Sequence, residues 1–216
     1  MPVDNETRSQ SYVDEILSTV FGPSVAQPRR NCAIPEWMVG KETEASRTLV
    51  QFLQRWGTCR AASSSFNWLL MPADWELDGR HIVFAVENQG VCRWAIRFQS
   101  TVDAVYQQPD GATDWYRESD GLLRFLLTFC LWNAVQRGLK HRQDAEETSS
   151  LQGLDRCFDA VDSRLGRASR QTRLFYSDGA AVFCGKQGAK WAIHAAFRTR
   201  RAMAKAQRQF AQSIRG

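Results

Sequence analysis

The sequence predicts an α+β fold, as a single domain in which an antiparallel sheet built from hairpins is wrapped by several helices. Two observations lead to this prediction. Paired runs of apolar, β-forming residues flank short turns at two places, and segments with helical periodicity lie around them. Helices and hairpins occur in blocks, without the β-α-β alternation that a parallel sheet requires. The 216 residues suffice for one core, so we expect one domain at 44–216, preceded by a tail, a short helix and a linker at 1–43.

Two helices are expected in the first quarter of the chain. Residues 11–21 have a short amphipathic pattern, with apolar residues on one side, which a Gly-Pro pair ends. Residues 44–56 show a clearer pattern, in which apolar residues follow the i, i+3, i+4, i+7 spacing until a glycine. The small, polar residues 61–65 predict a loop, and residues 66–71 predict a short strand or a turn.

The clearest hairpin signal lies in the middle of the chain. Two apolar runs rich in β-branched and aromatic residues, 81–86 and 91–96, flank the tetrapeptide Glu-Asn-Gln-Gly at 87–90. A similar order of Val-Phe, Gln-Gly and Trp-Ala-Ile recurs within residues 182–193. One interpretation is that two related hairpins belong to one sheet. The other is that unrelated hairpins reuse β-forming residues and glycine.

A long and strongly apolar helix is expected at 120–137. Its apolar residues cover most of the helix circumference, so we expect it to be the buried core helix. Ser119 or Asp120 is the expected N-cap, and Gly138 is the expected stop. The turn-forming residues 107–113, which precede it, predict a loop.

The last third of the chain is expected to contain further strands and helices. The charged segment 140–150 predicts a mobile loop, and the 3-4-3-4 apolar spacing of residues 151–165 predicts an amphipathic helix. Strands joined by tight turns and a final basic helix follow, with the strands at 172–177, 180–184 and 189–197 and the helix at 199–214.

Charge is distributed unevenly along the chain. Residues 164–216 contain twelve Lys and Arg and one acid, a net charge of about +11, whereas residues 1–163 have a net charge of about −6. Such asymmetry can mark a surface that binds nucleic acid or an acidic partner. A solvated basic face, or packing of the basic end near acidic loops of the same chain, explains it as well.

Composition also bears on the cellular compartment. Six cysteines are spread along the chain without a C-x-x-C pair, a pattern that favours buried free thiols in a reducing cytoplasm over disulfides or a zinc site. The longest apolar stretch, 122–135, is interrupted by polar residues and is too short to span a bilayer. The N-terminus lacks the apolar core of a signal peptide. We therefore expect a cytoplasmic protein with no metal, no cofactor and no membrane partner.

No catalytic motif accompanies these patterns. The sequence contains no P-loop, zinc-protease motif or dinucleotide-binding fingerprint, so we expect a protein that is not an enzyme. Among the acids, Glu87 is the best functional candidate, because it lies at the predicted hairpin apex. Its alternative role is turn formation, since Asn88 tolerates a left-handed backbone and Gly90 supplies a positive φ.

Many bacterial members of one superfamily share a pattern of Pro-x-x-Trp, an apolar strand, a Glu-Asn-Gln-Gly-like turn and a strand with Trp. Four short segments of this chain match it: Leu70-Met71-Pro72, Trp75, 83–91 and 94–96. On these residues the chain resembles the SUKH superfamily, which includes regulators of yeast cell-wall synthesis and bacterial toxin-immunity proteins. The resemblance extends over roughly residues 45–197. It implies an α+β sheet wrapped by helices, no enzymatic activity and binding of a cognate toxin. The chain departs from commoner members in its basic end and in lacking their Phe-Tyr-x-x-x-Asn-Gly segment, which leaves the partner open.

Two hypotheses about function follow. The first is a non-catalytic cytoplasmic immunity protein that binds and neutralises a bacterial polymorphic toxin. The alternative is a nucleic-acid-binding or regulatory module that uses the basic C-terminal region, with an affinity that falls steeply with salt. The candidate partner-binding residues lie at the hairpin and in the basic end: Glu87, Asn88, Gln89, Arg93, Arg198, Arg201 and Lys205.

Overall fold

The helices and antiparallel strands of the protein confirm the α+β class. A computed structural model of the chain describes residues 5–23, 32–119, 121–148, 151, 153–161 and 172–215. The α-helices are α1 (Asn5–Phe21), α2 (Glu44–Trp56), α3 (Arg60–Ser63), α4 (Leu122–Asn133) and α5 (Arg200–Arg215). Short 3-10 or π turns are η2 (Glu36–Met38), η3 (Pro72–Asp74) and η4 (Ala134–Gly138).

The strands form two separate antiparallel sheets. The N-terminal sheet consists of β1 (Trp68–Leu69), β2 (Glu76–Asp78), β3 (His81–Val86), β4 (Cys92–Arg97), β5 (Val105–Pro109) and β6 (Tyr116–Ser119). Its strand order is β1-β3-β4-β5-β6, and β2 also pairs with β3. The C-terminal sheet has the order β7-β11-β10-β9-β8, and consists of β7 (His141–Thr148), β8 (Asp159–Ala160), β9 (Thr172–Ser177), β10 (Ala180–Gln187) and β11 (Lys190–Phe197).

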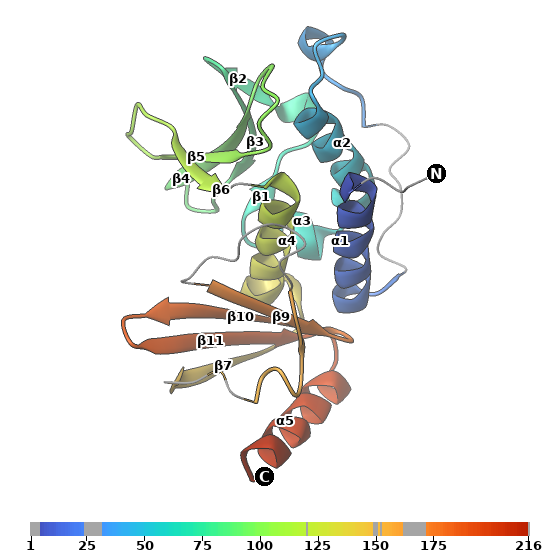
Figure 1. Cartoon of the computed structure of the whole chain (residues 1–216), viewed down its shortest axis with the longest axis vertical. Helices are drawn as coiled ribbons and strands as arrows, with labels where there is room; N and C mark the ends of the chain where they lie inside the picture. The colour runs from blue at the N-terminus through green and yellow to red at the C-terminus, as the bar shows by residue number, and fades with distance from the viewer. Residues whose placement is uncertain are drawn as a thin grey trace.

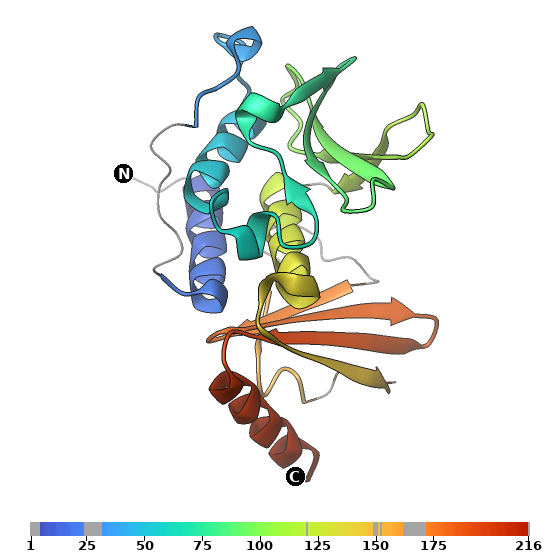
Figure 2. The ribbon, with the colours of Figure 1, turned by 180° about the vertical axis from the view of Figure 1, so that it is seen from behind.

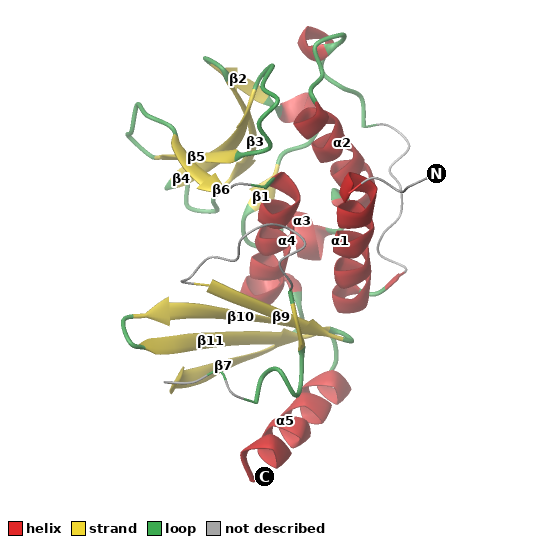
Figure 3. Cartoon of the chain, in the orientation of Figure 1, coloured by secondary structure: helices red, strands yellow, loops and turns green. Residues whose placement is uncertain are grey.

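The sheets lie toward opposite ends of the molecule, with α1 and α4 between them, α2 beside the N-terminal sheet and α5 beyond the C-terminal sheet (Figures 1 and 3). The predicted hairpin at 81–96 is confirmed as β3 and β4, and the predicted second hairpin as β10 and β11. The interpretation that both belong to one sheet is wrong. Helix α4 explains the separation, because its 12 residues span about 18 Å and carry the chain away from the first sheet before the next strand begins.

Helix α4 packs against both sheets. Toward the N-terminal sheet, the Phe125 ring lies 5.8 Å from that of Phe84, and the Phe129 ring lies 5.7 Å from that of Trp94. Near the end of the helix, the Trp132 ring lies 4.5 Å from that of Phe183 in β10. Nine of its twelve residues are buried, which confirms the predicted core helix. A helix that is apolar all round can cover two sheets at once.

The start of α4 differs from the prediction. Gly121 occupies the N-cap position, without a side-chain cap; of the two expected caps, Ser119 ends β6 and Asp120 lies outside the described residues. The Leu122 N–H instead donates to Asp103 Oδ1 at 3.0 Å. A carboxylate from a distant loop therefore accepts a hydrogen bond that a local cap would have accepted.

The N-terminal helices agree well with their predicted positions. Helix α2 has the predicted bounds 44–56, and Thr43 and Ser46 form a capping box at its start. Helix α1 begins earlier than the predicted residue 11 and ends at the predicted residue 21. Its apolar side is buried in the same core as α2 and α4, through Tyr12, Val13, Ile16, Leu17 and Val20.

Four segments fold differently from the prediction. The expected loop at 61–65 contains most of the short helix α3, and the expected loop at 107–113 contains the end of β5. The charged segment 140–150 contains β7, whose backbone pairs with β11 although its side chains do not alternate in polarity. The described part of the expected helix at 151–165 consists of turns and β8, and Gly153 near its start has a φ of +95°, outside the right-handed helical region. Residues 162–165 lie outside the described residues.

The end of α4 is joined to the rest of the fold by Asn133, which is fully buried. Its Nδ2 donates to Ala62 O at 2.7 Å and to Asn67 O at 2.9 Å, while its Oδ1 accepts from Asn67 N at 2.9 Å. The π turn η4 follows at once, and Gly138 lies so close to α3 that a Cβ there would be 2.2 Å from Ala61 O. The carboxamide therefore fixes residues 62–67 against the helix.

Replacing Asn133 with Ala tests this role. Three buried backbone groups would lose their partner, and each unsatisfied group costs roughly 1–3 kcal/mol. We expect Asn133→Ala to lower the free energy of unfolding by at least ~3 kcal/mol in urea denaturation, and the half-buried Gln136→Ala to lower it by less than ~1 kcal/mol. Equal effects of the two substitutions would contradict the role assigned to Asn133.

Candidate binding surfaces

The hairpin apex between β3 and β4 is a tight, internally bonded turn. The Glu87 carboxylate accepts a hydrogen bond from Gln89 N at 2.6 Å, and Glu87 O accepts one from Gly90 N at 3.0 Å. Gly90 has a φ of +74°, as the turn interpretation requires. Glu87 therefore stabilises the turn, whereas Gln89 is exposed at its tip.

The apex is tied to the core through Asn67. The Asn88 N–H donates to Asn67 Oδ1 at 3.4 Å, and Asn67 is bonded in turn to Asn133. The β1 residue Trp68 lies next to this contact, opposite Val86. The helix end thus determines where the apex lies.

Two large apolar side chains are exposed beside the apex. Trp68 is 46% exposed and Val91 is 53% exposed. Val91 O accepts from Asp110 N at 2.8 Å. This hydrogen bond holds the start of the β5–β6 connection beside the apex. We call Trp68, Gln89, Val91 and Asp110 the apex surface. The sequence analysis did not identify Trp68 and Val91 as candidate binding residues. The only signals for them were local: Trp68 lies within the short strand or turn predicted at 66–71, and Val91 directly follows the turn glycine.

Arg93 is held by contacts within the N-terminal sheet. Its guanidinium bonds to Asp78, to Gln108 Oε1 at 2.7 Å and, more distantly, to Glu76 at 3.9 Å. It also lies 5.4 Å from the centroid of the Trp115 ring. These contacts hold the connection between β5 and β6 against the sheet, so the structure gives Arg93 an internal role. Its role in binding a partner stays a prediction.

His81 lies in the same cluster of side chains. Its ring stacks on Trp115 at 4.7 Å and meets Tyr106 edge-on at 5.3 Å. Burial, followed by the positive charge of Arg97, holds the pKa of His81 below its usual value, while Asp78 acts in the opposite direction. His81 is therefore neutral at neutral pH and packs as an aromatic ring.

The basic candidates Arg198, Arg201 and Lys205 meet in one place. They line a groove of about 750 Å³ between the start of α5 and the turn that joins β9 to β10. Arg198 pairs with Asp178 at 3.1 Å, whereas Arg201 and Lys205 are exposed. Figures 1 and 2 place α5 and the N-terminal sheet at opposite ends of the molecule, so the two groups of candidates do not form one site.

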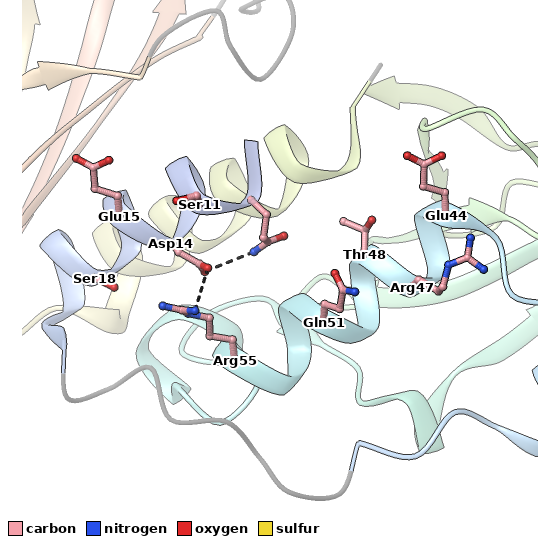
Figure 4. A pocket seen from close by; sticks show the side chains of 10 residues that line it. Ser11, Asp14, Glu15, Ser18, Glu44, Arg47, Thr48, Gln51 and Arg55 are labelled. Atoms are coloured by element: carbon pink, nitrogen blue, oxygen red, sulfur yellow. Dashed lines mark hydrogen bonds and ion pairs between the residues drawn. The ribbon is translucent and has the colours of Figure 1, made fainter. Parts of the chain in front are cut away.

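A polar cleft of about 940 Å³ lies between α1 and α2 (Figure 4). At one end, the Asp14 carboxylate accepts from the buried indole of Trp56 at 2.7 Å and from Gln10 at 3.4 Å, and it pairs with Arg55 at 3.2 Å. The carboxylate thus satisfies a buried N–H from the core, which is a structural role.

Four of the six cysteine side chains are buried. All six cysteines are free, and burial is the main cause that raises the pKa of Cys59, Cys92, Cys130 and Cys184, so these thiols stay protonated at neutral pH. Among the described residues, no three His, Cys, Asp or Glu side chains come together as a metal site would require. In the same residues, no helix is long and apolar enough to cross a membrane.

Comparison with known proteins gives no relative: no family model matches the chain, and no characterised protein or solved structure is detectably similar to it.

Replacing Asp14 tests its structural role. Asp14→Ala would leave the buried Trp56 N–H without an acceptor, at a cost of roughly 1–3 kcal/mol in the free energy of unfolding. Asp14→Asn keeps an acceptor oxygen and should cost less. The exposed neighbour Glu15 provides the control, and a loss from Glu15→Ala as large as that from Asp14→Ala in urea denaturation would refute the role.

The lowered pKa of His81 predicts a pH-dependent stability. In the unfolded chain a histidine takes up a proton near pH 6.5, while in the folded protein His81 does so only at lower pH. The stabilisation is therefore complete above about pH 6.5 and is lost as the pH falls toward the folded pKa. We expect the free energy of unfolding to fall more between pH 7.5 and 5.5 in the native protein than in His81→Phe. Identical slopes would be the contrary result, because all other titrating groups are common to both proteins.

Proposed function

We propose that the protein is a non-catalytic binding protein that neutralises a partner protein by covering it with the apex surface. The SUKH resemblance suggests that the partner is a cognate bacterial toxin and that the complex forms in the cytoplasm. The observation that supports this proposal most is the exposure of Trp68 and Val91 on either side of a firmly held turn.

The rigidity of the turn favours tight binding. Its backbone is fixed by the Glu87 contacts and by the Asn88–Asn67 hydrogen bond, so little conformational entropy would be lost on association. A half-exposed tryptophan beside such a turn is the type of residue that contributes most to protein interfaces. The exposed Gln89 and Asp110 would form the polar rim.

Charge suggests the character of the partner. Residues 66–119, which contain the N-terminal sheet, include eight acids and four arginines, a net charge of about −4. Complementary charge steers association and suppresses wrong partners. A basic partner surface, such as that of a toxin that acts on nucleic acid, fits this end of the molecule.

The structure offers two matched valines for a test. Val91 is 53% exposed at the apex, and Val102 is 46% exposed in the loop between β4 and β5, at the other end of those strands. We expect Val91→Asp to abolish rescue of growth when the protein is co-expressed with the C-terminal domain of the protein encoded upstream, and Val102→Asp to preserve it. Trp68→Ala should weaken the purified complex by about 2 kcal/mol, or roughly 30-fold in Kd.

Both valine variants should keep the native unfolding midpoint, since neither side chain is buried. Loss of rescue by both variants, or by neither, would contradict binding through the apex surface. Lack of rescue by the unaltered protein, when the upstream domain alone is toxic, would contradict the immunity role itself.

A further inference from the structure

The groove beside α5 has a row of cations along one wall. Arg201, Lys205 and Arg208 are spaced by four and three residues, so they lie on one face of the helix. All three are exposed, and no acidic side chain in the described part of the chain pairs with them. Asp178 is the only acid in the sequence after residue 163, and it is already paired with Arg198.

The groove is preformed by contacts on both sides. At the start of α5, Thr199 Oγ1 accepts from Ala202 N at 3.1 Å, and Ala206 is buried against the C-terminal sheet. On the other side, Gly179 O accepts from Arg198 N at 2.7 Å, and Gly179 N donates to Thr19 O in α1 at 2.9 Å. The cationic row therefore faces a fixed opposite wall.

The lining of the groove favours a peptide over a nucleic acid. Among the described residues that line it there is no aromatic side chain, whereas binding of single strands relies on base stacking. Asp159 lies in the opposite wall, where it would repel a phosphate backbone. An extended peptide can place carboxylates toward the cations and its backbone amides toward this acid.

We propose that the groove binds an acidic segment of a protein, with carboxylates on Arg201, Lys205 and Arg208. The groove lies at α5, beyond the C-terminal sheet, and shares no residue with the apex surface, so it serves a second contact that does not depend on the proposed function. Small side chains on the helix, Ala202 and Ala206, leave room for the peptide backbone between the two walls.

Fluorescence anisotropy with two labelled probes tests the proposal. The probes are a 12-residue peptide of alternating Glu and Gly and a 12-nucleotide single-stranded DNA of mixed sequence. We expect the native protein to bind the peptide more tightly than the DNA at 50 mM salt, and Lys205→Glu/Arg208→Glu to weaken peptide binding at least tenfold. Val91→Asp should leave it unchanged, which separates this site from the apex surface.

The control reverses two exposed cations that lie away from the groove, Lys41 before α2 and Arg80 in the β2–β3 turn. The double variant Lys41→Glu/Arg80→Glu has the same change in net charge. It should change peptide affinity by less than twofold. Tighter binding of the DNA, an equal loss in both double variants, or no binding of the peptide by the native protein would each overturn the proposal. Circular dichroism of both variants verifies that the helix content of the protein is unchanged.

Discussion

The fold depends on one helix that is apolar around most of its circumference and on the buried amide at its end. Helix α4 contacts the N-terminal sheet through Phe125 and Phe129 and the C-terminal sheet through Trp132, so both sheets pack against the same element. Asn133 then bonds to the backbone of residues 62–67. Since an unpaired buried amide is costly, this register of helix and loop is strongly specified.

That register places the surface that we propose to be functional. Asn67 accepts from Asn88 at the hairpin apex, so a chain of three asparagines joins the helix end to the turn. Trp68, one residue further, is held at the edge of the sheet with half of its side chain exposed. The apex surface belongs to the N-terminal sheet and the basic groove to α5, beyond the other sheet, and the two differ in charge, which suits a protein with two separate contacts.

Secondary structure was predicted reliably where it depends on local sequence patterns, that is, on apolar periodicity and on turn residues. The bounds of α2, the β3–β4 hairpin and the buried character of α4 followed from periodicity and turn residues. The two sheets, the pairing of the charged strand β7 and the exposure of Trp68 depend on contacts between distant segments, which no local pattern contains. Residues 151–161 show the limit clearly, because the apolar spacing predicted a helix where turns place Leu154 and Phe158 in the core. The SUKH resemblance stays a prediction.

Binding of a protein through the apex surface is the central claim, and hydrogen exchange of the complex tests it most directly. The protein would be compared alone and bound to the toxic C-terminal domain encoded upstream. We expect added protection to be concentrated in the backbone amides of residues 66–69 and 87–91, with little change in α5. Protection confined to α5 and the β9–β10 turn, or unchanged exchange at 87–91 in a stable complex, would contradict the claim.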